Sequence, residues 1–212
     1  MMNTPPLPPL ASGWPMRLAC LGLALAPFSS ALAVDGTITI NGEIIDSTCK
    51  INGAAPPADI LVTLPKIGQT ALKNEGDVAG ATAFVIALTE CPATLSGKVK
   101  AYFEPGPTTD YDTGNLYAYT TTDGKTKASS IPGNQASQTQ FQKVQIQLAN
   151  PDSTAIKIGA SENKAAGVEL QNGTDGKKTA TLRYLARYYK SSSGDITPGK
   201  LYTYVQYSIA YP

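Results

Sequence analysis

Few residues of this sequence carry the side chains that catalysis most often uses. The 212 residues include no histidine, which excludes Ser-His-Asp and Cys-His catalysis and removes the commonest metal ligand. Asp110, Asp112 and Gly114 open a calcium-loop pattern, but Thr121 stands where such a loop has its bidentate glutamate. The segment Gly173–Thr179 lacks the glycine spacing of a phosphate-binding loop. We therefore expect no enzymatic activity, no metal and no cofactor.

The first 33 residues have the pattern of a signal peptide. Arg17 precedes an apolar run, and Ala31 and Ala33 supply the small residues at −3 and −1 of a cleavage site. The apolar run is shorter than the roughly 20 residues that span a bilayer. Residues 1–33 are therefore predicted to be a signal peptide, with Met16 as an alternative translation start, and the mature chain is predicted to be exported.

The two cysteines that follow the leader are Cys49 and Cys91. An even pair in an exported protein indicates a disulfide. Closing that loop stabilises the fold by about 4 kcal/mol in the chain-entropy model. Two buried free thiols are the alternative.

The mature chain has no electrostatic preference for a polyanion. Removing the leader with Arg17 leaves 16 basic residues against 16 acidic ones, and no run of like charge stands out. Nucleic-acid binding is therefore not expected.

Short apolar–polar alternations, separated by Gly, Pro and Asn turns, indicate an antiparallel β-sandwich. Phe141–Leu148 is expected to face its apolar side chains inward and its glutamines outward, and Lys125–Thr139 is expected to be a surface excursion. Thr179–Tyr189 also fits a helix, but its β-branched and aromatic residues favour a strand. The predicted strands are Thr48–Ile51, Ile60–Leu64, Ala81–Cys91, Lys98–Phe103, Leu116–Thr122, Phe141–Leu148, Ile156–Ile158, Thr179–Tyr189 and Leu201–Tyr211.

The segment Gly36–Ile45 begins within three residues of the predicted cleavage site. Its isoleucines at 38, 40 and 44 alternate with polar residues, and Gly42 shares their register. A period of two over this length predicts a strand with one face meant for burial. Gly42 marks either a simple bulge or a point at which the strand passes close to another surface.

Tyrosines are concentrated near the C-terminus, with seven of them after residue 183. Aromatic rings of this kind pack sheets and subunit interfaces, and a sugar-stacking platform is the alternative.

Four motifs follow one another along the mature chain. They are an alternating N-terminal segment with Gly42 within it, the pair Cys49 and Cys91, the segment Leu185-Ala186-Arg187-Tyr188, and a last strand with Gly199 fourteenth from the end and Tyr211 penultimate. In this order after a signal peptide, the chain resembles the chaperone–usher pilins, the major subunits of type 1-like fimbriae. Leu64–Ile67, Ala101–Tyr111 and Val205–Pro212 are similar to the Bordetella-type serotype fimbrial subunits.

The resemblance implies an all-β fold, an incomplete immunoglobulin-like β-sandwich that lacks its last strand and is completed by a donor strand. Residues 34–45 would be the N-terminal donor-strand extension and residues 46–212 the pilin domain. The donor side chains implied are Ile38, Ile40, Gly42 and Ile44. The residues implied for the C-terminal strand, which lines the groove and contacts the chaperone, are Gly199, Leu201, Val205, Tyr207, Ile209 and Tyr211.

The resemblance also implies the partners and the location of the protein. The partners are neighbouring copies of the chain, a periplasmic pilus chaperone, an outer-membrane usher, a tip adhesin and a host-surface receptor. The protein would pass through the periplasm to the cell surface and serve as a structural subunit of an adhesive fimbria. A minor or adaptor subunit and a free-standing carbohydrate-binding β-sandwich are the alternatives.

Overall fold

The computed structural model describes residues 38–45, 48–161 and 163–212. The chain divides into two units, Met1–Glu43 and Ile44–Pro212. In the first unit, residues 38–43 belong to no helix or strand. The predicted signal peptide, with Ala31 and Ala33, lies outside the described residues.

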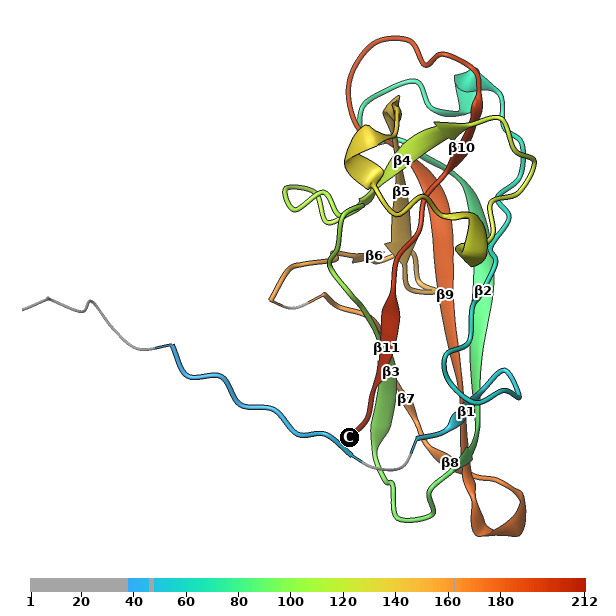
Figure 1. Cartoon of the computed structure of the whole chain (residues 1–212), viewed down its shortest axis with the longest axis vertical. Coiled ribbons are helices and arrows are strands. Elements are labelled where there is room, and N and C mark those ends of the chain that lie inside the picture. The colour runs from blue at the N-terminus through green and yellow to red at the C-terminus, as the bar shows by residue number, and fades with distance from the viewer. Residues whose placement is uncertain (1–37, 46–47, 162) are drawn as a thin grey trace, which may run out of the picture. The chain divides into compact units, whose positions relative to one another are not determined.

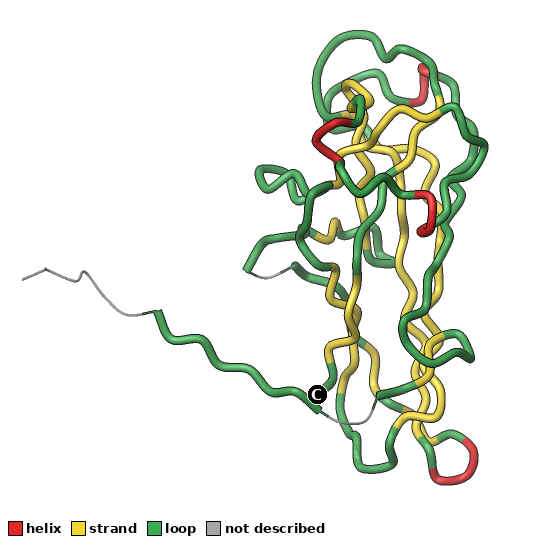
Figure 2. The backbone as a smooth tube through the Cα atoms, viewed as in Figure 1, coloured by secondary structure: helices red, strands yellow, loops and turns green. Residues whose placement is uncertain are grey.

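Within the described residues, the second unit is built almost entirely of β-strands (Figures 1 and 2). The only helices in its described part are the one-turn 3₁₀ segments η1 (Gln69–Ala71), η2 (Ala128–Ser130), η3 (Gln135–Ser137) and η4 (Thr174–Gly176). No helix in this described part is long and apolar enough to cross a membrane. The strands are β1 (Lys50–Ile51), β2 (Val78–Cys91), β3 (Lys98–Phe103), β4 (Leu116–Thr121), β5 (Gln140–Ala149), β6 (Ala155–Ile156), β7 (Val168–Glu169), β8 (Gln171–Asn172), β9 (Lys178–Lys190), β10 (Lys200–Tyr202) and β11 (Tyr207–Ala210).

The strands form two antiparallel sheets. The larger has the order β1-β2-β9-β5-β4-β10, with β6 added to β5 and β8 added to β9, and the smaller has the order β11-β3-β7. The long strands β2 and β9 pair along most of their length, from Val78↔Tyr189 to Cys91↔Lys178. The all-β prediction is confirmed.

The core lies between the two sheets. In β3 every second side chain is buried, and Val99, Ala101 and Phe103 pack against Ile86 and Leu182 of the larger sheet. This alternation follows from the strand period of two.

Tyr184 of β9 is wholly buried in this core and joins the two sheets. Its ring contacts Phe84 and Phe103, with centroids 5.9 and 5.3 Å away. Its hydroxyl accepts a hydrogen bond from the Ala101 N–H (3.0 Å) and donates one to the Ala166 carbonyl (2.8 Å).

Several predicted elements are changed in the structure. Ile60–Leu64 belongs to no strand, because its backbone has no ladder partner. The last segment, Leu201–Tyr211, is two strands rather than one. Lys200–Tyr202 (β10) pairs with β4 of the larger sheet and Tyr207–Ala210 (β11) pairs with β3 of the smaller sheet, so the chain crosses from one sheet to the other between them.

The glutamines of Phe141–Leu148 were expected to face solvent; Gln142 is exposed, but for the other two the prediction is wrong. Gln145 and Gln147 are only 5% and 8% exposed. Gln145 donates to Asp110 (2.6 Å), and Gln147 donates to Asn115 (3.0 Å). Arg187 of β9 in turn donates to Gln147 at 2.6 Å. The segment before β4 therefore covers the outer face of the sheet and buries a hydrogen-bonded polar network there.

Candidate functional site: an apolar groove beside the last two strands

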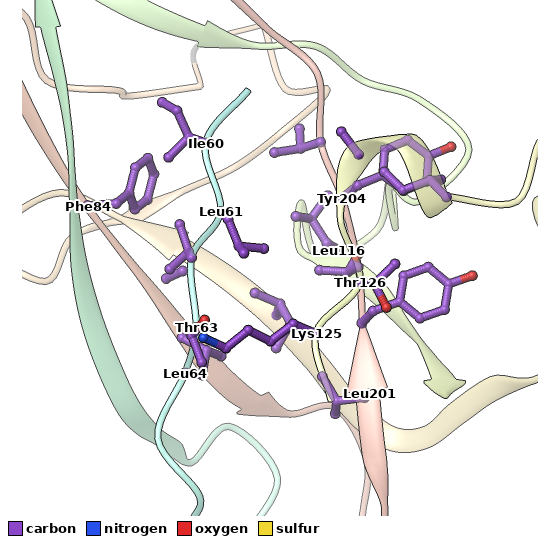
Figure 3. A pocket seen from close by; sticks show the side chains of 18 of the residues that line it. Ile60, Leu61, Thr63, Leu64, Phe84, Leu116, Lys125, Thr126, Leu201 and Tyr204 are labelled. Atoms are coloured by element: carbon purple, nitrogen blue, oxygen red, sulfur yellow. The ribbon is translucent and has the colours of Figure 1, made fainter. Parts of the chain in front are cut away.

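The second unit contains a groove with a volume of about 1890 Å³. One wall is the segment Pro56–Leu72, which precedes β2. The opposite wall is Gly199–Tyr211, which contains β10 and β11 (Figure 3). The groove thus lies between the first and the last parts of this unit.

The floor of the groove is the hydrophobic core itself. Ile86, Leu116, Ile146 and Leu148 line it, and each is at most 4% exposed. The half-buried ring of Phe84 lies beside Ile60 in Figure 3. An apolar ligand seated here would therefore rest directly on the core.

Both walls present backbone without a β-ladder partner. β10 ends the larger sheet and β11 ends the smaller one, so each has a free edge. On the first wall, Pro56–Leu72, residues 57–68 belong to no strand. Next to β11, the Glu104 N–H donates to the Gln206 carbonyl. Because hydrogen-bonded and non-bonded pairs alternate between antiparallel strands, the N–H groups of Tyr207 and Ile209 then point away from β3. The missing structure that fits this gap is one β-strand.

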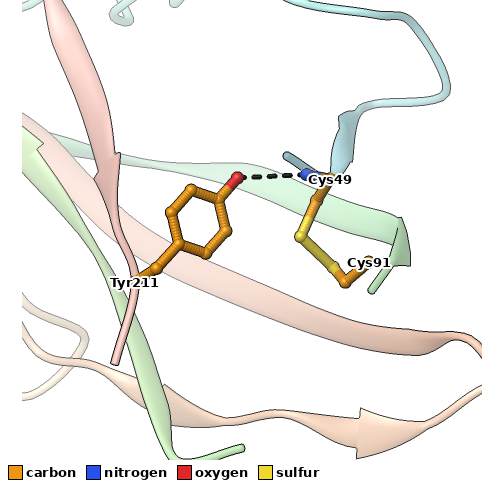
Figure 4. Close-up of a disulfide and its surroundings, with 3 residues drawn as sticks. All are labelled: Cys49, Cys91 and Tyr211. Carbon is orange, nitrogen blue, oxygen red and sulfur yellow. Dashed lines mark hydrogen bonds between the residues drawn. A yellow bond between two sulfur atoms is a disulfide. The ribbon is translucent and has the colours of Figure 1, made fainter. Parts of the chain in front are cut away.

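Two tyrosines link the walls at the β11 end of the groove. The Tyr207 hydroxyl donates to the Ala58 carbonyl (2.6 Å). The Tyr211 hydroxyl accepts a hydrogen bond from the Cys49 N–H (3.1 Å), as Figure 4 shows. Burial, and then the charge of Asp59, raises the pKa of Tyr207, so this hydroxyl remains a hydrogen-bond donor at neutral pH.

The disulfide anchors the start of this unit. Cys49 and Cys91 are bonded, with an S–S distance of 2.10 Å, and both are buried. The bond ties the residue before β1 to the end of β2 (Figure 4). The predicted disulfide is therefore confirmed, and it fixes the chain shortly before the first wall begins at Pro56.

The loop between β4 and β5 also lines the groove. Residues 123–129 and 131–133 contribute to the lining, whereas the sequence predicted only a surface excursion over Lys125–Thr139. Lys125 extends from this loop toward Thr63 and Leu64 of the first wall (Figure 3). Nothing in the local sequence signals this placement, because it depends on where the loop returns to the sheet.

All six residues predicted for the C-terminal wall line the groove. These are Gly199, Leu201, Val205, Tyr207, Ile209 and Tyr211. At Gly199 a Cβ would lie 3.0 Å from the Phe141 ring, so a larger residue would crowd this end.

The residues predicted for the donor strand are exposed. Ile38, Ile40 and Ile44 are 90%, 89% and 99% exposed, and a Cβ added at Gly42 would meet no atom within 4 Å. Three large apolar side chains in strand register are thus left open to solvent, which is costly for an exported protein unless a partner covers them.

Asp110 is the one buried carboxyl in the polar network that holds the segment before β4. Burial alone would raise its pKa, but hydrogen bonds from Gln145, Thr113 and the Asp112 backbone outweigh it and lower the pKa below the ordinary value of 3.8. Its oxygens are occupied by protein donors. Among the described residues, no group of His, Cys, Asp or Glu has an arrangement that could hold a metal ion.

The model of the family FimA, type-1 fimbrial protein A, matches residues 64–212, which include every strand from β2 to β11 and the C-terminal wall. The chain belongs to the type-1 fimbrial protein family. It is 45% identical over 201 residues to the serotype 2 fimbrial subunit of Bordetella pertussis, covering 91% of this chain and 95% of that one. It is 43% identical to the serotype 3 subunit of the same organism, covering 94% and 98%.

Solved structures show the same fold. The P pilus rod subunit PapA superposes with a TM-score of 0.52 at 16% identity, over 78% of this chain and 100% of that one. A chaperone–usher pilus subunit gives a TM-score of 0.51 at 20% identity, over 84% and 95%. The incomplete immunoglobulin-like sandwich is therefore confirmed.

Family membership answers the broad question of function. The protein is a structural subunit of a fimbria, and its family is one of structural proteins rather than enzymes. Subunits of this family assemble with neighbouring subunits into surface fimbriae.

Proposed function

We propose that this subunit polymerises head to tail by donor-strand exchange. The segment Gly36–Ile45 of one copy enters the groove of the next, and its isoleucines face the groove floor. The observation that carries this proposal is the match between a one-strand gap over an open core and a free strand with one apolar face. Addition of a donor strand to a sheet edge is an established recognition mode, and chaperone–pilin complexes use it.

The energetics favour a long-lived contact. Burying Ile38, Ile40 and Ile44, all nearly fully exposed, is worth about 1.5–3 kcal/mol for each side chain. Each new ladder bond to the free edge of β10 or β11 adds about 0.5–1.5 kcal/mol. A contact between two different surfaces that does not close into a ring generates an open filament.

The same groove explains the need for assembly partners. An unpaired edge over an exposed core favours aggregation, so a periplasmic chaperone would cover the groove until an outer-membrane usher brings the next donor strand. In this scheme residues 1–33 direct export and are removed after Ala33. The finished fimbria, with a tip adhesin, supports attachment to a host-surface receptor.

Gly42 has a particular role in this scheme. It shares the register of the isoleucines but adds no side chain, so the donor strand can pass a narrow part of the groove there. Gly42→Leu should therefore slow exchange.

A truncation tests the proposal. Deleting Val34–Ile44 from the full-length protein should give a subunit that folds but cannot donate, so that no SDS-resistant multimers form. Filaments built by the truncated protein would overturn the proposal. Ile40→Ser is the point version, and Thr39→Ser, on the other face of the same strand, is its matched control and should assemble normally.

A further inference from the structure

The two ends of the groove differ in charge. Lys66 and Lys200 line the end near Leu64 and Leu201, and the Lys200 ammonium donates to the Thr122 carbonyl at the start of the β4–β5 loop (2.9 Å). At the other end Asp59 lies close enough to Tyr207 to raise the pKa of that hydroxyl, after the larger effect of burial. Lysines outnumber the single carboxylate of Asp123 at the first end, which is therefore net cationic, and the other end carries the Asp59 carboxylate.

Lys125 stands at the cationic end without a partner of opposite charge. It is exposed and lines the groove. Among the described residues it makes no salt bridge, since the one ion pair found there joins Lys50 to Glu90. Figure 3 shows its side chain between Leu64 and Leu201, running from the β4–β5 loop toward the opposite wall. Because Lys125 is exposed, its ammonium group is reached from solvent and not from the buried floor.

The donor strand carries one carboxylate among its described residues, Glu43. Glu43 lies between Gly42 and Ile44, so the strand period of two turns it to the face opposite the isoleucines. When the isoleucines face the floor, the Glu43 side chain faces the mouth.

The walls set where Glu43 comes to rest. The first wall runs from Ile60 to Leu64 in the direction in which the last segment runs from Tyr204 back to Leu201 (Figure 3). A donor strand antiparallel to the last segment therefore ends, with Glu43, beside Leu64, Leu201 and the lysines. The parallel orientation would instead bring Glu43 to the end that holds Asp59, away from Lys125.

We propose that Lys125 of the accepting subunit pairs with Glu43 of the incoming donor strand, and that this pair selects the orientation and register of the strand. The inference rests on the proposed donor-strand exchange and names a residue that determines its specificity. Because a pairing slip of one residue would turn the isoleucines away from the floor, a charge that favours one register adds to the selectivity of the groove.

The pair lies at an exposed rim, so its effect on the rate of dissociation is moderate. Exposed ion pairs change an equilibrium by about 1.4- to 5-fold, and salt weakens them. Lys125→Glu and Glu43→Lys each place like charges together. We therefore expect either change to speed the dissociation of SDS-resistant multimers by at least about twofold at low salt. The difference should shrink at about 1 M salt, where the Debye length is about 3 Å.

A charge swap tests the pairing in the full-length protein. The double variant Glu43→Lys with Lys125→Glu restores opposite charges, so its multimers should dissociate at the wild-type rate. Lys177→Glu makes the same charge change on a residue away from the groove. Combining it with Glu43→Lys should not return the dissociation rate to that of the wild type. Additive losses in the double variant would overturn the proposal.

Carbodiimide cross-linking of purified filaments gives an independent readout. It joins a carboxylate to an amine only when the two are in contact, and mass spectrometry should find the Glu43 peptide joined to the Lys125 peptide. Lys125→Arg keeps the charge and removes the reactive amine, so it should keep multimer stability and lose this cross-link. Joining of Glu43 to lysines outside the groove end would overturn the pairing.

These outcomes separate the two proposals. If the charge variants behave as wild type while deletion of Val34–Ile44 abolishes multimers, donor-strand exchange stands and the Lys125 pairing is wrong. If the deleted protein still assembles, donor-strand exchange itself is wrong.

Discussion

Removing the single hydroxyl of Tyr184 should destabilise this subunit more than any other tyrosine-to-phenylalanine change in the described core. The register of β3 with β7, Lys98↔Glu169 and Val99↔Val168, places Ala101 opposite Ala166. Instead of pairing directly, these two backbone groups share the Tyr184 hydroxyl, at 3.0 and 2.8 Å. The hydroxyl therefore completes the ladder between the two strands from the opposite sheet.

The size of the effect follows from what Tyr184→Phe leaves behind. The ring contacts with Phe84 and Phe103 remain, so little apolar burial is lost. The Ala101 N–H is buried and loses this partner, whereas Ala166 is exposed and its carbonyl can bond to water instead. A buried polar group left unpaired costs about 1–3 kcal/mol, so the free energy of unfolding should fall by about 1–3 kcal/mol.

Guanidinium unfolding of purified assembled fimbriae, followed by circular dichroism, measures this loss as a lower transition midpoint. Tyr111→Phe is the matched control, because Tyr111 is 68% exposed and its change should be close to neutral. A Tyr184→Phe midpoint equal to that of the control would refute the reasoning, since the hydroxyl would then contribute nothing to joining the sheets.

Three further predictions concern the disulfide, the buried carboxyl and the donor glycine. Cys49→Ser should lower the free energy of unfolding by about 4 kcal/mol and reduce the periplasmic level of the subunit in immunoblots; an undiminished level would contradict it. Asp110 has a lowered pKa in the folded state, so its contribution is present above 3.8 and is lost as pH falls below that value. Asp110→Asn should accordingly lower the free energy of unfolding at pH 7. In unfolding titrations the variant should also lose less of this free energy between about pH 4 and pH 2 than the wild type does, and an unchanged loss would contradict this role of Asp110. Gly42→Leu should reduce the yield of SDS-resistant multimers, whereas a normal yield would favour a simple bulge at this position.

The strands that sequence reasoning placed best are those with one buried and one solvent-facing side. Lys98–Phe103 matches β3 residue for residue, because its burial alternates strictly. Thr179–Tyr189 could be assigned to a strand through its β-branched and aromatic residues, although its apolar spacing also suited a helix. In both cases the local pattern and the tertiary environment agree.

The errors arose where distant segments change the environment of a strand. Gln145 and Gln147 are polar residues on the outer face of β5, and no local feature shows that Asp110 and Asn115 will cover and bond them. Ile60–Leu64 has the apolar character of a strand but lacks a ladder partner in this chain. That absence is itself informative, because the segment forms one wall of the groove.

The candidate site was half predictable for the same reason. The resemblance to pilins implied the C-terminal wall, and its six predicted residues line the groove. The first wall, Pro56–Leu72, lies about 140 residues before the C-terminal wall in the sequence, and Lys125 lies about 80 residues before it. Only the folded structure brings them to the same groove. Periodicity within a segment does not encode such neighbours.

The most direct test of donor-strand exchange is an intermolecular cross-link from within the donor strand. A photoreactive amino acid at position 40 would be introduced into the full-length protein, and filaments would be assembled from equal amounts of ¹⁵N-labelled and unlabelled subunits. After irradiation, the account predicts hybrid-mass cross-links between the position-40 peptide and the groove-wall segment Leu201–Tyr211 of a neighbouring subunit. Cross-links confined to chains of one isotope, or directed to surfaces outside the groove, would contradict it.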